Sequence, residues 1–364
     1  MMLSAGNGFI MQSEKYSRDN AGQSLKKYIL LKKGELAYNH GASKAKQYGC
    51  CYELTEDEAR IPYVYHCFKV SGAEHTPYVA TALNNPKIDR QLKRLVSSSV
   101  RMDGLLNISF DDYMSVILHL PSLKEQTHIA DFLKKLDERI TAQEKLVASL
   151  KKYKRGLLNA FFAEKSDYFL FSDASALKIE EVCDVLSGKR IPKGETFCSH
   201  PTEYRYITVS DMGEKYVCSD NLQYISEHTE KQISRYKVKG GDIIISVAGT
   251  LGKLNIITSD LGGVNLTENC DRFTNFRGVG SEYLYYVLSS DLIQSQIESS
   301  KTKNGQPKLA LERIRNFTIP VPHQEIQEQL VKVMISLDQY IASQLAILDR
   351  YCKLRSGLLQ QLFI

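Results

Sequence analysis

Several features that enzymes commonly need are missing from this 364-residue sequence. It contains no Pro-Pro dipeptide, which excludes the [N/D/S]-P-P-[Y/F/W] tetrapeptide of a self-sufficient DNA methyltransferase. It also contains neither Asp-x-Lys nor Glu-x-Lys, the pattern of a common class of metal-dependent nuclease. Its eight histidines are scattered without metal-ligand spacing. We therefore expect no catalytic residues, no metal site and no cofactor bound by this chain.

The cysteines, the apolar runs and the net charge exclude further classes. The eight cysteines include no C-x-x-C pair, so neither a zinc site nor a disulfide framework is indicated. No apolar run approaches the length that crosses a bilayer, and residues 1–10 do not resemble a signal peptide. These absences predict a cytoplasmic protein with reduced thiols and no membrane partner. A net charge of +5 is too small to identify a nucleic-acid binder, so any anionic partner must meet local basic clusters.

The sequence contains an internal repeat. Residues 121–162 and 322–363 align without a gap at a constant offset of 201, with 11 identities in 42 positions. Self-similarity at a fixed spacing indicates a duplicated unit. The expected order is a first globular block at 1–120, a helix at 121–165, a second block at 166–320 and a second helix at 321–364. The predicted fold class is α+β, with two mixed α/β domains separated by two long helices.

Both repeats have the 4-3-4 apolar spacing of a coiled coil. A helix of about 40 residues is a rod of roughly 60 Å. With a globular block between them, the two helices are expected to pair with each other as an antiparallel coiled coil. The predicted seam consists of Ile129, Leu133, Leu136, Ile140, Gln143, Val147, Leu150, Leu157, Leu330, Met334, Leu337, Ile341, Gln344, Leu348, Tyr351 and Leu358.

Two polar features of these helices leave alternatives open. Gln143 and Gln344 interrupt the seam at equivalent positions and either fix the register of the pair or face solvent. The basic cluster at 151–155 is read first as favourable charge near a helix C-terminus and only second as a DNA contact.

The second block has the pattern of a mixed α and β domain. Residues 206–209 and 242–247 predict strands, and residues 283–297 predict one helix. The segment 249–253 lacks the complete G-x-x-x-x-G-K-[ST] phosphate loop, so a strand that ends in a tight turn is the preferred interpretation.

Short motifs in a fixed order resemble the specificity subunit of type I restriction–modification enzymes. The first repeat has P-x-x-x-E-Q at 121–126, L-x-x-L-D-x-x-I at 133–140 and K-R-G-L-L at 154–158. The second block adds Leu186-Ser187-Gly188, G-D-I-I at 241–244 and G-T-x-G at 249–252. The resemblance covers essentially the whole chain, and its strength comes from the order and duplication of motifs that are individually weak.

This resemblance implies a DNA-binding subunit of a restriction system that is not itself an enzyme. In that family, two target-recognition domains read the halves of a bipartite site in double-stranded DNA, and the helices hold them apart. Methyltransferase (M) subunits with S-adenosylmethionine and restriction (R) subunits with ATP and Mg would be the protein partners. The alternative is a coiled-coil scaffold or dimerisation protein that does not read DNA sequence.

The first block departs from the family pattern in its length. The segment Tyr28 to Leu36 resembles Tyr236 to Ile243. However, only 33 residues precede Gly34, whereas Gly241 lies about 75 residues beyond the end of the first helix. We therefore expect the first recognition domain to lack about 40 residues, including counterparts of the 188–192 loop and the 206–209 strand.

Residue type and loop position suggest the DNA-facing side chains. Lys and Arg suit phosphate, Arg can also pair with guanine, and Asn or Gln can pair with adenine. For any single residue, a solvated loop position is the simpler explanation. The candidates are Lys189, Arg190, Lys193, Lys301, Lys303, Asn304, Gln306 and Lys308.

Overall fold

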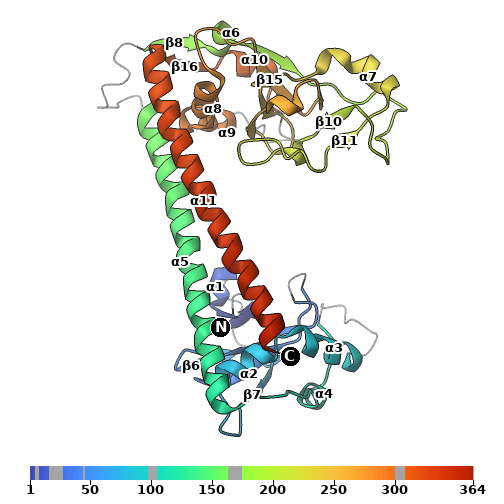
Figure 1. Ribbon diagram of the computed structural model, residues 1–364, viewed down its shortest axis with the longest axis vertical. Coiled ribbons are helices and arrows are strands. Elements are labelled where there is room, and N and C mark those ends of the chain that lie inside the picture. Colours follow the sequence, from blue (N-terminus) through green and yellow to red (C-terminus); the bar gives the residue numbers. More distant parts are fainter. Residues whose placement is uncertain are drawn as a thin grey trace. The chain divides into compact units, whose positions relative to one another are not determined.

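The computed structural model describes residues 1–4, 8–15, 28–43, 46–96, 105–162, 174–299 and 308–363. It divides into two compact units (Figure 1). Unit 1 comprises residues 1–145 and 345–364, and unit 2 comprises residues 146–344. Each unit thus contains a globular part and half of each long helix. Within the described residues, no helix is both long and apolar enough to cross a membrane.

Unit 2 is built on a four-stranded antiparallel sheet in the order β13-β12-β15-β9. A three-stranded sheet, β11-β10-β14, and a two-stranded pair, β16-β8, complete it. The strands are β8 Ser175–Lys178, β9 Asp184–Ser187, β10 Arg205–Ile207, β11 Gln223–Tyr224, β12 Ile243–Ser246, β13 Leu254–Ile256, β14 Asn265–Leu266, β15 Cys270–Thr274 and β16 Thr318–Val321. The helices are α6 Ile179–Val182, α7 Glu227–Ile233, α8 Ser281–Ser289, α9 Asp291–Ser299 and α10 Leu311–Arg315, with short 3-10 turns η2 Val209–Asp211, η3 Ser234–Tyr236 and η4 Ser259–Leu261.

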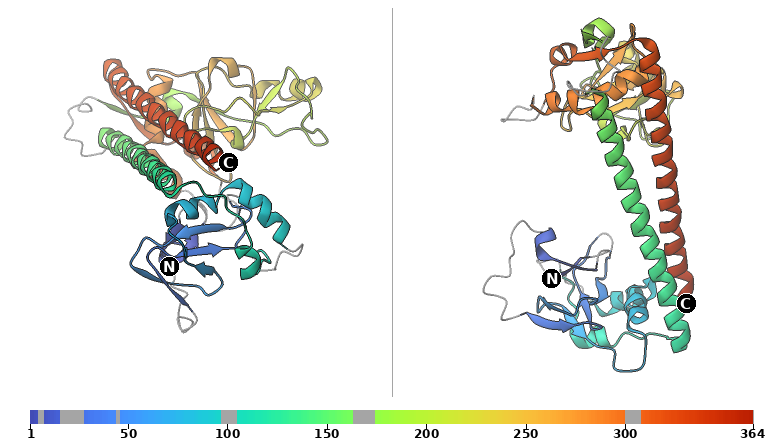
Figure 2. Two further views of the ribbon diagram at one scale, coloured as in Figure 1. Left: turned by 60° about the horizontal axis from the view of Figure 1, so that its bottom comes forward. Right: turned by 90° about the vertical axis from the view of Figure 1, so that its left-hand side faces the viewer.

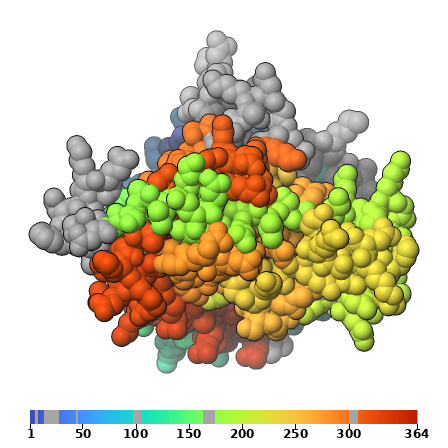
Figure 3. All heavy atoms as spheres, turned by 90° about the horizontal axis from the view of Figure 1, so that it is seen from above, coloured from blue at the N-terminus to red at the C-terminus, as the bar shows by residue number. Residues whose placement is uncertain are grey.

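The central strand β12 explains how these layers pack. Its side chains alternate between two apolar clusters because successive residues of a strand point to opposite faces. Ile243 and Ile245 belong to the cluster that contains the helices, whereas Ile244 belongs to the cluster of the three-stranded sheet. All three side chains are fully buried. Seen from above in the space-filling view, the green, yellow and orange segments of unit 2 lie against one another (Figure 3).

Unit 1 contains a smaller version of the same arrangement. Its described sheets are β1-β2, β3-β6 and β5-β4-β7. The strands are β1 Met2–Ser4, β2 Gly8–Ile10, β3 Ile29–Lys32, β4 Leu36–Asn39, β5 Cys50–Glu53, β6 Glu58–Ile61 and β7 His66–Phe68. The short helices are α1 Gln12–Lys15, α2 Thr76–Ala82, α3 Pro86–Leu95 and α4 Phe110–Met114.

The predicted correspondence between the two globular blocks is visible at one turn. Gly34 and Gly241 both have a positive φ, of 82° and 87°, a conformation that favours glycine. The next residue closes each turn, because the Glu35 carboxylate accepts the Lys32 N–H and the Asp242 carboxylate accepts the Lys239 N–H, both at 2.8 Å. The strand β4 therefore corresponds to β12. In unit 2 the strand β15 also pairs with β9, and the described residues of unit 1 contain no strand in that place beside β7.

Two long helices run without interruption through the repeats. Helix α5 spans Leu123–Phe162 and α11 spans Gln324–Leu362, and the paired halves in each unit run antiparallel (Figure 2). No residue of the predicted seam is exposed; the buried ones are Leu133, Leu136, Val147, Leu330, Met334 and Ile341, and the others are partly buried. Gln143 and Gln344 belong to different units, so their role in register stays a prediction.

Gln126 and Gln327, identical in the repeat, explain the P-x-x-x-E-Q motif. Each amide nitrogen donates to the carbonyl oxygen of the proline five residues upstream at 3.0 Å. The Gln126 oxygen accepts the N–H of His75 at 3.0 Å, and the Gln327 oxygen accepts the N–H of Gly280 at 3.4 Å. His75 and Gly280 precede α2 and α8, respectively. One buried amide in each unit thus ties the long helix to the globular part.

Two details of the predicted elements were wrong. The single helix expected at 283–297 is two helices, α8 and α9, separated by Ser290. Ser290 has extended backbone angles, its hydroxyl donates to the Val287 carbonyl, and Asn159 of α5 accepts the N–H of Asp291. The strand expected at 206–209 ends at Ile207, because the Asp211 carboxylate accepts the Thr208 N–H and starts a 3-10 turn.

Candidate nucleic-acid interface

A close backbone contact at Gly188 positions the first basic loop. A Cβ on this residue would lie 2.0 Å from the carbonyl oxygen of Thr267, so only glycine fits without a backbone shift. The Gly188 N–H donates to Cys270 at 3.0 Å, and the Lys189 N–H donates to Leu266 at 2.8 Å. The chain that leaves β9 is therefore held against the loop between β14 and β15.

Lys189 and Lys193 both have exposed side chains in this loop. The hydroxyl of the buried Tyr206 donates to the Lys189 carbonyl oxygen at 2.7 Å, which fixes the backbone. The Lys189 ammonium lies 5.7 Å from the centre of the Tyr236 ring. The loop thus presents cations to solvent from a fixed backbone, an arrangement suited to phosphate.

Arg190 forms an ion pair that the sequence did not indicate. Its Nε lies 3.1 Å from a carboxylate oxygen of Glu268, and its side chain is 82% exposed. Such an exposed pair contributes little to stability. The guanidinium can therefore exchange Glu268 for a phosphate or a guanine edge at low cost.

A hollow of about 400 Å³ lies beside this ion pair. Aromatic and polar side chains from three loops line it, and the ring of the partly exposed Phe197 lies 5.5 Å from that of Tyr206. Sequence reasoning did not find its lining residues Phe197, Thr208, Ser210, Glu268 and Asn269. No motif marks them, because they lie on separate segments that the fold brings together: β10 pairs with β14, and the Thr267 N–H donates to the Ile207 carbonyl oxygen at 3.0 Å.

Lys308 lies at the same end of the four-stranded sheet as the 188–193 loop. It forms a β-bridge with Ala248, and its side chain is exposed. The neighbouring Val247 donates its N–H to Asn269 at 2.8 Å and accepts the N–H of Leu309 at 2.9 Å. The structure thus brings Lys308 to the loop that carries Glu268, although the two are far apart in sequence.

The other four candidates, Lys301, Lys303, Asn304 and Gln306, lie outside the described residues. Their contribution to DNA binding stays a prediction.

A buried carboxyl group lies on the sheet near these loops. Asp271 is 3% exposed on β15, where burial raises its pKa to about 6. A hydrogen bond with Ser187 and the charges of Lys308 and Arg315 oppose this rise. Asp271 therefore titrates close to neutral pH.

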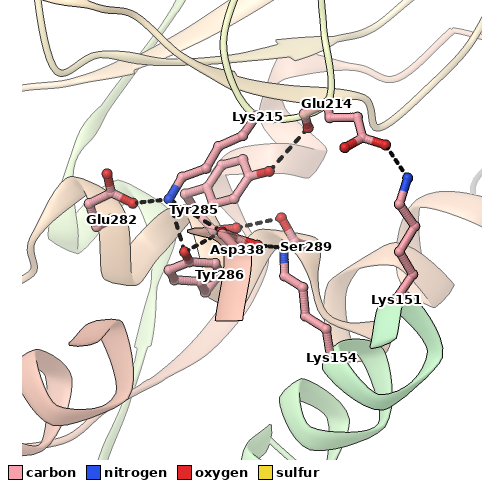
Figure 4. Close-up of polar contacts among 9 residues, drawn as sticks. All are labelled: Lys151, Lys154, Glu214, Lys215, Glu282, Tyr285, Tyr286, Ser289 and Asp338. Carbon is pink, nitrogen blue, oxygen red and sulfur yellow. Dashed lines mark hydrogen bonds and ion pairs between the residues drawn. The ribbon is translucent and has the colours of Figure 1, made fainter. Parts of the chain in front are cut away.

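A polar cluster attaches the globular part of unit 2 to its helices (Figure 4). The Lys215 ammonium lies 2.7 Å from a Glu282 carboxylate oxygen and donates to the Tyr286 hydroxyl at 2.9 Å. Tyr286 in turn donates to Asp338 of α11 at 2.7 Å. Burial and the adjacent Asp338 raise the pKa of Tyr286, so its hydroxyl keeps the donated proton at neutral pH. Glu282 and Tyr286 belong to α8, and the cluster therefore joins the 213–217 loop to two helices.

The basic cluster at the end of α5 is engaged in ion pairs within unit 2. Lys151 pairs with Glu214, Lys154 pairs with Asp338, and Arg155 pairs with Asp291 at 2.9 Å. The first two pairs are drawn in Figure 4. Sequence analysis considered helix-end charge and DNA contact for this cluster but did not foresee that it fastens α5 to the domain.

The comparison with protein families identifies the class of this domain. The family model described as the type I restriction modification DNA specificity domain matches residues 172–349. This range contains the basic loop, the hollow and the four-stranded sheet. The class of unit 2 is therefore a DNA specificity domain.

Curated relatives and solved structures extend the match. The MjaVIII specificity subunit of Methanocaldococcus jannaschii is 23% identical over 261 residues, which cover 68% of this chain and 61% of the relative. The EcoBI specificity subunit of Escherichia coli is 23% identical over 316 residues, which cover 81% and 62%. The chain thus spans about three-fifths of the length of these relatives.

Two solved structures have the same fold. One comes from work on complex assembly and conformational transition of the type I R-M system and has a TM-score of 0.61 at 17% identity. The match covers 92% of this chain and 82% of the chain in that structure. The S subunit of a type I restriction–modification system from M. genitalium has a TM-score of 0.53 at 17% identity, with 93% and 85% covered. Residues 172–349 of the chain thus match the type I restriction modification DNA specificity domain, and the chain is similar to specificity subunits of type I restriction enzymes.

Proposed function

We propose that this chain is the DNA-reading subunit of a type I restriction–modification enzyme and is not itself catalytic. It binds double-stranded DNA in the cytoplasm, reads a bipartite target and serves as the scaffold for methyltransferase and restriction subunits. S-adenosylmethionine, ATP and Mg belong to those partners and not to this chain.

One observation carries the proposal: Lys189, Arg190, Lys193 and Lys308 come from separate segments to one end of a sheet in a DNA specificity domain. Cations on a fixed backbone hold the phosphate chain, while the polar lining of the adjacent hollow offers donors and acceptors to base edges. The domain as a whole has no large basic excess, so binding depends on this local cluster.

The long helices supply the second part of the proposal. Helix α5 continues unbroken for 40 residues, which corresponds to roughly 60 Å. DNA rises about 3.4 Å per base pair, so a rod of this kind suits half-sites separated by several unread base pairs. Changing the helix length should then change the preferred spacing.

The test uses the full chain assembled with the methyltransferase subunits of its own system. Methylome sequencing of a host that carries these genes should reveal one bipartite motif, and a labelled duplex with that motif should bind more tightly than one with a scrambled motif. Equal retention of both duplexes, or protein assembly without any methylated motif, would instead support the scaffold alternative.

A matched pair of variants tests the site itself. Arg190→Ala with Lys193→Ala should weaken DNA binding and reduce its salt dependence by about one unit of slope for each phosphate that the loop no longer binds. The control is Lys178→Ala with Lys231→Ala, which also removes two exposed cations from unit 2. If both double variants bind DNA as the parent does, the loop is not part of the interface.

A further inference from the structure

We propose that unit 1 binds an extended segment of a second polypeptide along residues 116–120. The incoming segment would have the sequence character of Ser175–Val182, form a strand like β8 and place its apolar side chains in a groove beside α2 and α3. This inference goes beyond the proposed function and does not depend on DNA binding.

The repeat identifies the corresponding segments of the two units. Helix α4 spans Phe110–Met114 and α10 spans Leu311–Arg315, so both bounds differ by 201. The same offset relates residues 117–120 to β16, residues 318–321. What covers β16 in unit 2 therefore indicates what residues 117–120 are shaped to receive.

In unit 2 the strand β8 covers β16. The pairing is antiparallel, with Ile319 opposite Leu177. Pro320 has no N–H, and the Phe317 carbonyl accepts the N–H of Ile179 at 2.9 Å. The backbone groups that bond to the added strand are thus those of residues 317, 319 and 321, which correspond to 116, 118 and 120.

The corresponding backbone in unit 1 is open at these positions. Among the described residues, no hydrogen bond reaches the backbone N–H or C=O of Leu118 or Leu120. Ile117, directly before Leu118, is satisfied, because the Gln91 side chain donates to its carbonyl at 2.9 Å and accepts its N–H at 3.0 Å. In an extended strand, the backbone groups of alternate residues point to opposite edges. Among the described residues, the edge of Ile117 is therefore occupied, and the edge of Leu118 and Leu120 is open.

Apolar side chains next to this edge are also left uncovered. Ile117 is 64% exposed, and Leu120 is 37% exposed. On α4, Phe110 and Met114 are 43% and 40% exposed. In unit 2 the counterpart of Met114 is Arg315, whose guanidinium donates to the Val185 carbonyl of β9 at 3.0 Å.

A groove of about 460 Å³ runs beside residues 117–121. Its lining includes Tyr78, Ile88, Leu118 and Ile129. The equivalent residues in unit 2 are Tyr283, Ile293, Ile319 and Leu330, which are all buried in the cluster against which Leu177 packs. The offset is 205 for the first two, because α2 and α3 begin at Thr76 and Pro86 whereas α8 and α9 begin at Ser281 and Asp291.

The occupant follows from this equivalence. The groove is where the counterpart of Leu177 would lie. The open N–H and C=O groups of unit 1 correspond to the groups of β16 that bond to β8 in unit 2. In unit 2, residues 179–187 lead from β8 to β9, which pairs with β15. A bound segment that continued in the same way would pair with β7, the counterpart of β15 in unit 1. Main-chain pairing would supply affinity, and alternate apolar side chains would supply specificity.

A peptide-binding experiment with the full chain tests this proposal. The probe is a fluorescein-labelled peptide of residues 174–187 with Cys183→Ser, and anisotropy is the measurement. We expect saturable binding to the parent chain. The peptide variant with Leu177→Asp and Ile179→Asp should bind at least about tenfold more weakly, because its charges cannot enter the groove.

Variants of the chain locate the site. Leu118→Pro removes one N–H donor, and Leu120→Asp places a charge at the groove; each should weaken peptide binding at least about tenfold. Phe132→Asp is the matched control, because Phe132 is also an exposed apolar residue of unit 1 and should leave binding unchanged. Thermal melts verify that each variant is folded.

Three results would overturn the proposal: no saturable binding of the peptide, equal binding of the charged peptide variant, or equal binding to all three chain variants. The first means that other residues already cover the edge, and the third means that the peptide binds elsewhere. None of these results would affect the DNA-binding experiment, so the two proposals fail independently.

Discussion

Asp137 and Arg355 form a two-point ion pair between α5 and α11 in unit 1. The Arg355 Nε and Nη2 atoms donate to the two carboxylate oxygens, and the Nη2 bond is 3.0 Å long. Adding 201 to Asp137 gives Asp338, and subtracting 201 from Arg355 gives Lys154. These two residues pair in unit 2. The same acid–base pair thus occurs once in each unit, with the two helices exchanging roles.

The two pairs should differ in strength. Asp338 is 21% exposed and also receives the Tyr286 hydroxyl, whereas Asp137 is 46% exposed. We expect Asp338→Asn to lower the free energy of unfolding by about 2 kcal/mol and Asp137→Asn by about 0.5 kcal/mol. Urea denaturation monitored by circular dichroism measures both changes. Equal losses would show that the extra partners of Asp338 contribute nothing.

The buried amide of Gln327 should be essential to its unit. Gln327→Leu leaves the carbonyls of Gly278 and Pro322 without their donor, and we expect a loss of about 2 kcal/mol. Gln324→Leu is the control, because Gln324 is exposed at the start of the same helix. Differential scanning calorimetry should show a lower Tm for the first variant only. A Tm unchanged by Gln327→Leu would refute the anchoring role of the repeated glutamine.

Asp271 should make the stability of unit 2 depend on pH. Its folded pKa of about 6 lies above the ordinary value of 3.8, so the native state holds the proton more tightly than the unfolded state. Stability therefore falls as pH rises from about 4 to about 6 and is level above that range. The shift corresponds to about 3 kcal/mol.

Asp271→Asn removes this dependence, because the amide stays neutral. We expect the variant to gain stability over the parent at pH 7 and to gain little at pH 4, as measured by urea denaturation at both pH values. A gain of equal size at both values would mean that the carboxyl does not titrate in this range.

The contact at Gly188 should tolerate no side chain. Gly188→Ala would place a methyl group 2.0 Å from the Thr267 carbonyl oxygen, so the basic loop must shift, at a cost of about 3 kcal/mol. DNA affinity should fall with it, because the shift also moves Lys189 and Arg190. Gly280→Ala is the control, since no atom lies within 4 Å of its added Cβ. Unchanged stability and affinity of Gly188→Ala, measured by thermal melts and gel shift, would contradict the role of this contact.

Local pattern was enough to recognise the long helices and the turn at Gly34 and Gly241. Apolar spacing reports helix periodicity, and a positive φ favours one residue type, so both signals survive in a single sequence. The break at Ser290 was missed because it depends on Asn159, a residue more than 130 positions away. The ion pair of Arg190 with Glu268 was missed for the same reason.

By itself the sequence determined the duplication, the two uninterrupted helices and the family that the chain resembles, because these depend on order and period along the chain. Tertiary structure alone decided which loops meet around the hollow and that the 151–155 cluster binds acids of its own unit. It also decided that Leu118 and Leu120 have backbone groups without a partner among the described residues. Those features arise from contacts between distant segments, and their free energies depend on burial and distance that no local pattern encodes.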